Sequence, residues 1–106
     1  MASGILGTPA ALAAGTYTTL YTVPVDTFAV GSVSIVNRGN TALTVRLAVA
    51  DASTPTNAEF IEYDSTLAPK AILERTGIVM QAGKLLVVYS SAVNCNAVAF
   101  GIETAA

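Results

Sequence analysis

The sequence contains no histidine, no tryptophan and a single cysteine among its 106 residues. Without histidine it lacks the usual general base near neutral pH and the commonest metal ligand. Cys95 cannot form a disulfide within the chain, and one thiol alone cannot supply an ordinary zinc site. We interpret Cys95 as a small buried side chain in a protein from a reducing compartment. We expect no enzymatic activity, no metal and no cofactor.

Charged residues are also scarce. They make up 11% of the chain, whereas hydrophobic residues make up 53%; an ordinary soluble domain has about 25% charged residues. Part of the apolar surface should therefore be covered by other protein molecules, most naturally by further copies of the chain. The net charge of −2, with five Lys and Arg residues, provides no basic surface, so we expect no binding to nucleic acid.

Long apolar runs are missing as well. None approaches the length of about 18 residues that a membrane-spanning helix needs. No Lys or Arg precedes Arg38, so the charged beginning of a signal peptide is absent. We therefore expect a chain that is made in the cytoplasm, is not processed and does not bind membranes.

What the chain does have is strand periodicity. Residues 42–50 alternate Leu43, Val45, Leu47 and Val49 with smaller or polar residues, which is the period of a half-buried strand. Turn residues separate this segment from others of similar character, and no convincing helix is present. The pattern predicts one all-β domain of about seven or eight short strands, an antiparallel β-sandwich or jelly-roll-like fold. The expected strands are residues 16–23, 28–36, 42–50, 58–63, 70–81, 84–91 and 96–103.

The segments between these strands predict local features. Residues 37–40 suit a turn, so we expect the strands on either side to form a hairpin. Gly31 indicates a bulge or a close approach of two backbones. Residues 51–57 and 64–69 are expected to be exposed loops.

Residues 1–15 show neither strand nor helix periodicity. They predict an extended N-terminal arm outside a domain of residues 16–106. The arm carries Ile5, Leu6 and Leu12, which are too apolar for a solvated tail and are candidate contacts with a neighbouring subunit. Arg46 is a fourth candidate interface residue, because it projects outward from the strand of residues 42–50. It is either a solvated charge or one half of a salt bridge between subunits.

Carboxylates and tyrosines are the remaining residues that could form a catalytic, calcium or carbohydrate site. Glu59, Glu62 and Asp64 are close in sequence, but Glu59 and Glu62 fall on opposite faces of the expected strand. A glycosidase-like pair or a calcium loop is therefore not expected. The tyrosines lie on separate strands, which favours packing in a core or interface over a carbohydrate platform. They are Tyr17, Tyr21, Tyr63 and Tyr89.

The ordered strands resemble a group of small all-β virion proteins of tailed bacteriophages, described as head decoration (cement) or tail-associated proteins. The resemblance covers most of residues 20–103 and consists of strand and turn patterns without a catalytic signature. The matching segments are Leu20-Tyr21-Thr22-Val23-Pro24, Val33-Ser34-Ile35-Val36-Asn37-Arg38, Thr44-Val45-Arg46-Leu47-Ala48-Val49-Ala50, Ala82-Gly83-Lys84, Val87-Val88-Tyr89-Ser90-Ser91 and Val98-Ala99-Phe100-Gly101-Ile102-Glu103.

The resemblance implies a compact sandwich, often trimeric, located in the virion. As a cement protein on the capsid surface, the chain would bind the major capsid protein and stabilise the head lattice. Alternatively, as a tail or fibre module, its loops at residues 51–57 and 64–69 would contact a receptor or glycan on the host surface.

Overall fold

The computed structural model describes residues 3–106, and it confirms that the chain is all-β. Each strand expected from the sequence is present, and the N-terminal segment adds one more. The elements are β1 (Ser3–Leu12), β2 (Thr16–Thr22), β3 (Thr27–Asn37), β4 (Leu43–Ala50), the short 3₁₀ helix η1 (Asn57–Glu59), β5 (Phe60–Leu67), β6 (Ile72–Met80), β7 (Leu85–Ser90) and β8 (Cys95–Ala105). Within the described residues, no helix is long and apolar enough to cross a membrane.

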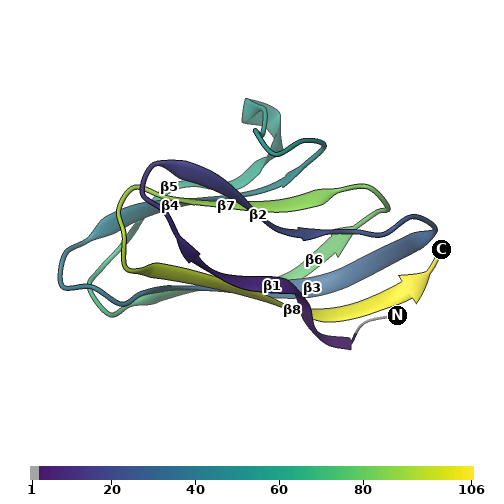
Figure 1. Ribbon diagram of the computed structural model, residues 1–106, viewed down its shortest axis with the longest axis horizontal. Helices are drawn as coiled ribbons and strands as arrows, with labels where there is room; N and C mark the ends of the chain where they lie inside the picture. The colour runs from purple at the N-terminus through teal and green to yellow at the C-terminus, as the bar shows by residue number, and fades with distance from the viewer. Residues whose placement is uncertain (1–2) are drawn as a thin grey trace.

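The strands form two antiparallel four-stranded sheets that lie one above the other (Figure 1). The first sheet has the order β1-β8-β3-β6, and the second has the order β2-β7-β4-β5. On one side, the β1–β2 connection links the sheets. On the other side, Arg75 of β6 forms an ion pair with Glu62 of β5. This pair joins an edge strand of each sheet.

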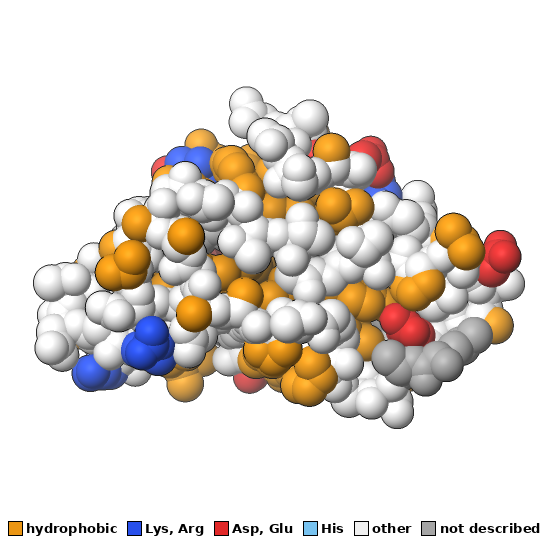
Figure 2. All heavy atoms as spheres, in the orientation of Figure 1, with side chains coloured by type: hydrophobic (Ala, Val, Ile, Leu, Met, Phe, Trp, Pro, Cys, Tyr) orange, Lys and Arg blue, Asp and Glu red, His pale blue; other side chains and the backbone are white. Residues whose placement is uncertain are grey.

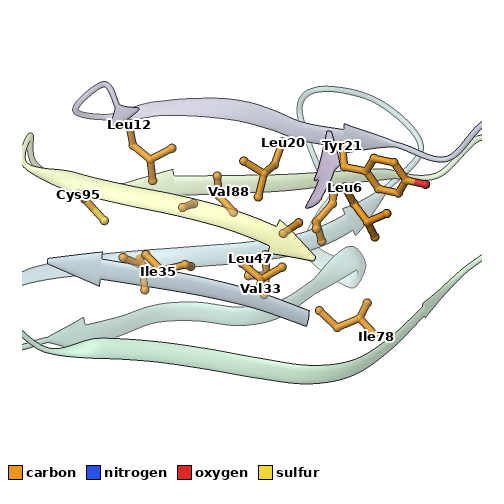
Figure 3. Close-up of a cluster of buried hydrophobic side chains, with 14 of the residues drawn as sticks. Leu6, Leu12, Leu20, Tyr21, Val33, Ile35, Leu47, Ile78, Val88 and Cys95 are labelled. Atoms are coloured by element: carbon orange, nitrogen blue, oxygen red, sulfur yellow. The ribbon is translucent and has the colours of Figure 1, made fainter. Parts of the chain in front are cut away.

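The main core fills the space between the sheets. Buried and less buried residues alternate along the whole of β3, as expected for a strand with one face covered. From the second sheet, Val45, Leu47 and Val88 belong to the same buried cluster as Val33 and Ile35 of β3. Figure 3 shows Val33, Ile35, Leu47 and Val88 between the two layers. The sequence periodicity of residues 42–50 therefore identified the inward row of β4 correctly.

The prediction of an N-terminal arm is wrong for the part that the structure describes. Residues 3–12 form β1, which pairs with β8, and Leu6 and Leu12 are buried in the chain's own core (Figure 3). Ile5 faces outward and is 52% exposed. Residues 1 and 2 of the expected arm lie outside the described residues.

A bulge explains why β1 has no visible period. Leu6 is opposite Ala99 and Ala10 is opposite Ala97, so β1 advances four residues where β8 advances two. The two additional residues, an even number, keep Leu6 and Leu12 on the same side of the strand, but Thr8, midway between Leu6 and Ala10, is exposed in the bulge. Leu6 and Leu12 therefore both reach the core although the sequence between them reads as irregular.

The predicted hairpin around residues 37–40 is also wrong, because β3 and β4 belong to different sheets. The side chain of Asn37 stabilises the segment that passes from the first sheet to the second. This side chain is fully buried, its Nδ2 donates to the carbonyl oxygens of Thr41 at 2.9 Å and Leu67 at 3.1 Å, and its Oδ1 accepts from the N–H of Gly39 at 2.9 Å. These side-chain bonds satisfy backbone polar groups where the chain passes from one sheet to the other. In a hairpin, the pairing of the two strands would satisfy such groups.

Strand β5 begins and ends later than expected, since residues 64–67 were predicted to be loop. Asp64, which reads as a turn residue, lies inside the strand with a positive φ of 50°. Val45 is opposite Ser65 and Leu47 is opposite Glu62, so Tyr63 and Asp64 together face Arg46. The turn signal at Asp64 therefore marks a bulge and not the end of the strand.

Gly31 lies at a close approach, as its sequence position suggested. A Cβ at residue 31 would come within 3.0 Å of the Phe100 carbonyl oxygen and 3.1 Å of Leu6 Cδ1. The adjacent register shift gives β6 the additional residue, because Gly31 is opposite Ile78 and Val33 is opposite Arg75. The absence of a side chain at residue 31 thus leaves room for the Leu6 side chain and for the Phe100 carbonyl oxygen.

Stability is expected to fall at alkaline pH because of Tyr21. Burial raises the pKa of its hydroxyl, and the hydrogen bond to the Glu103 carboxylate raises it further. A folded-state pKa above the ordinary value contributes stability that is complete below about pH 10 and is lost as the pH rises further. The buried Cys95 thiol, whose pKa is also raised by burial, acts in the same direction from about pH 8.5.

Urea unfolding at pH 8 and pH 11 separates these two groups. The Tyr21→Phe variant should lose less stability between the two pH values than the wild type, since phenylalanine does not titrate. Cys95→Ala serves as the matched control for the thiol. Identical pH dependence in the Tyr21→Phe variant and the wild type would contradict the assignment to Tyr21.

Candidate functional site

The outer side of the first sheet exposes apolar side chains across its strands. Val79, Val30 and Ile102 lie opposite one another on β6, β3 and β8, and Ile72 lies opposite Val36 in a second row. Ile72 is 63% exposed and Val79 is 69% exposed. Figure 2 shows apolar side chains along the lower margin of the molecule, where this sheet lies in Figure 1. We call this surface the apolar face; its residues include Ile5, Val30, Val36, Ile72, Val79, Val98, Phe100 and Ile102.

A groove of about 350 Å³ interrupts the apolar face beside the bulge of β1. Pro9 and Ala11 line one side of it, and Val36 and Val98 line the other. Asn96 also lines the groove, and its buried Oδ1 has no hydrogen-bond partner among the described residues. The groove is therefore mainly apolar and has one unsatisfied polar group at its wall.

The outer side of the second sheet has a different character, because its register brings aromatic residues together. Tyr17 of β2 is opposite Tyr89 of β7, and Tyr89 is opposite Arg46 of β4. The bulge in β5 places Tyr63 and Asp64 across from Arg46. One row across the sheet thus contains three tyrosines, an arginine and an aspartate. We call this row, together with Phe60 of β5, the aromatic face.

Arg46 holds the aromatic face together from within the chain. Its guanidinium carbon lies 4.4 Å from the ring centre of Tyr63 and 4.5 Å from that of Tyr89. Its Nε donates to Asp64 Oδ1 at 2.6 Å, and its Nη1 donates to the Tyr17 hydroxyl at 2.9 Å. The bond to Asp64 and then the bond to Tyr17 raise the pKa of the guanidinium. Arg46 therefore has a salt-bridge partner, Asp64, within its own chain. The sequence interpretations, a solvated charge or a salt bridge between subunits, did not include this pairing.

The rings also contact one another and cover a small second core. Phe60 meets Tyr63 edge to face at 4.9 Å, and Tyr17 lies 5.1 Å from Tyr89, distances typical of favourable aromatic pairs. Ala48 and Val87 occupy outward positions on β4 and β7, yet they are almost completely buried. The outer side of the second sheet is thus partly packed, as the outer side of a solvated sheet would not be.

Sequence reasoning missed the aromatic face. Separate strands were taken as evidence that the tyrosines are dispersed, but adjacent strands can bring residues distant in sequence into one row. The available signal was the outward position of Arg46 on β4. Tyr89 occupies an equivalent position on β7, but the strand order and register needed to match them are not visible in the sequence.

Glu59, Glu62 and Asp64, which are close in sequence, are bonded to separate partners within the chain. Within residues 3–106, no group of three or more Cys, Asp and Glu side chains could hold a metal ion. Asp51, Glu59, Glu62 and Asp64 each have a partner of their own. The hydrogen bond from the Thr56 backbone N–H lowers the pKa of Glu59. The pairs are Glu62 with Arg75, Asp64 with Arg46, Asp51 with Lys84, and Glu59 with the N–H groups of Thr56 and Asp51.

Cys95 is completely buried at the beginning of β8, in agreement with its expected packing role. Burial raises the pKa of its thiol, so the thiolate that a nucleophile requires is disfavoured.

Comparison of the chain with protein-family models, with curated proteins and with solved structures finds no match. The structure defines an all-β protein of two antiparallel sheets, one with an apolar outer face and one with an aromatic outer face. Its resemblance to phage virion proteins remains a prediction from the sequence.

Proposed function

We propose that the chain is a non-enzymatic structural protein of a virion, a capsid decoration (cement) protein with a β-sandwich fold. The observation that carries this proposal is the apolar face. Val79 and Ile102, which flank Val30 in one row across the sheet, remain more than half exposed there, whereas monomeric proteins rarely leave large contiguous apolar patches uncovered. The low content of charged residues, 11%, offers little to hydrate such a surface.

The proposed neighbours are further copies of the chain and the major capsid protein. Trimerisation, which the family resemblance implies, would cover part of the apolar face, and the capsid would cover another part. The groove beside β1 adds a contact for a partner that inserts an apolar group and donates a hydrogen bond to Asn96. Many copies bound to one shell would stabilise the assembled lattice, because ligands that bind the assembled state shift the equilibrium toward it.

A second candidate is a tail- or fibre-associated module for attachment to a host receptor or glycan. The aromatic face supports this candidate, because it leaves Tyr63 55% exposed on the opposite sheet. Copy number separates the two functions: a capsid protein should be present at on the order of hundreds of copies per virion, and a tail protein at far fewer.

The cement proposal is tested with Ile72→Asp, which puts a charge at the β6 edge of the apolar face. Wild-type protein should sediment as an oligomer and bind shells from particles that lack it. The variant should lose affinity at least roughly tenfold, since burying an unpaired charge is costly. Val25→Asp is the matched control, because Val25 is 82% exposed in the turn before β3. A monomeric wild type that does not bind shells would refute the proposal.

A further inference from the structure

The aromatic face contains a hollow that the cement function does not use. Asn57 of η1 and the rings of Phe60 and Tyr63 line this hollow, whose volume is about 380 Å³. Ligand sites commonly have volumes of roughly 300–1,000 Å³. The side chain of Tyr63 in its wall is 55% exposed. Figure 1 shows the segment around η1 beyond the second sheet, on the side away from the first sheet.

The wall of this hollow is held in place before any ligand arrives. The Tyr63 ring contacts the Arg46 guanidinium at 4.4 Å and meets the Phe60 ring edge to face at 4.9 Å. Glu59, the last residue of η1, accepts hydrogen bonds from the backbone N–H groups of Thr56 and Asp51 at 2.8 and 3.0 Å, which ties the loop that carries Asn57 to the end of β4. A binding surface ordered in this way loses little conformational entropy when a ligand binds.

The groups around the exposed ring indicate the chemistry of the ligand. The nearest cation, Arg46, is neutralised by Asp64 through bonds of 2.6 and 3.3 Å, so an anionic ligand would find no free positive charge there. The Asn57 amide offers hydrogen bonds at the wall of the hollow. An open hollow with an aromatic wall and a polar rim suits a ligand that is apolar on one face and rich in hydroxyl groups at its edges.

We propose that this hollow is a binding site for a neutral saccharide. The C–H face of a pyranose ring would stack on Tyr63, with Phe60 beside it, and the sugar hydroxyls would bond to Asn57. The site does not depend on the proposed capsid function, because it lies on the second sheet and the apolar face lies on the first. Loss of one activity therefore leaves the other unchanged.

Saturation-transfer NMR with a panel of neutral mono- and disaccharides, including glucose, galactose, rhamnose and N-acetylglucosamine, tests the site. At least one sugar should bind the wild-type protein and shift the Tyr63 ring signals. Tyr63→Ala should weaken binding roughly tenfold, which corresponds to about 1.4 kcal/mol, whereas Tyr63→Phe keeps the ring and should stay within about threefold. Asn57→Ala, which leaves every ring in place, should also weaken binding.

Ile72→Asp is the matched control from the other sheet, and it should bind sugar as the wild type does. The proposal is refuted if no saccharide in the panel binds at millimolar concentration. It is equally refuted if Tyr63→Ala binds like the wild type, or if the Tyr63 signals respond to purified shells and not to any sugar, since the aromatic face would then be a protein contact.

Discussion

Replacing Leu6 with alanine is expected to lower the free energy of unfolding by roughly 3 kcal/mol, within the range measured for leucine-to-alanine changes in cores. Leu6 is 0% exposed, and its Cδ1 lies close to Gly31 of β3, two strands away in the same sheet. Truncation would leave a cavity that Gly31 has no side chain to fill. Urea denaturation monitored by circular dichroism measures the change.

Ile5→Ala is the matched control for this prediction, because Ile5 is adjacent in the chain but is 52% exposed on the apolar face. Its substitution should cost the isolated chain less than about 1 kcal/mol, as is usual for surface positions. The contrast separates an integral strand from the arm that the sequence suggested. If both variants were as stable as the wild type, β1 would not contribute to the core as described.

The strands with unbroken alternation were predictable because they obey one local rule. Val45 and Leu47 of β4 point inward every second residue, and the sequence alone shows this. The rule failed where a bulge intervened, as between Leu6 and Ala10 of β1. It failed again at Asp64, whose turn-like character marks a bulge inside β5. Bulges depend on the partner strand, which local sequence does not describe.

Sheet assignment could not be predicted from the turn between β3 and β4. A short polar turn suits a hairpin, but the bonds of Asn37 to Thr41 and Leu67 carry the chain into the other layer. The aromatic face was hidden for the same reason. Tyr17 and Tyr89 are 72 positions apart in the numbering of the chain, and only the pairing of β2 with β7 places them side by side. Long-range pairing therefore determined the features that bear on function.

Gly7→Ala is expected to lower the free energy of unfolding by roughly 4 kcal/mol or to unfold the chain completely. Gly7 lies in the bulge of β1 with a φ of +68°, where an alanine is strained by about 1–2 kcal/mol. In addition, its Cβ would overlap the Leu20 carbonyl oxygen and come within 3.0 Å of Tyr21 Cβ. Because the clash is with backbone, β1 and β2 would have to separate.

Gly15→Ala separates the cost of the positive φ from the cost of the steric clash. Gly15 has nearly the same φ, +65°, but an added Cβ there would meet no atom within 4 Å. This control should therefore show only the conformational strain of about 1–2 kcal/mol, and the difference between the two variants measures the contact of β1 with β2. Equal losses in thermal and urea unfolding would mean that Gly7 does not touch β2. The larger loss at Gly7 would show that the N-terminal strand, which pairs with β8 in the first sheet, also packs against β2 of the second sheet.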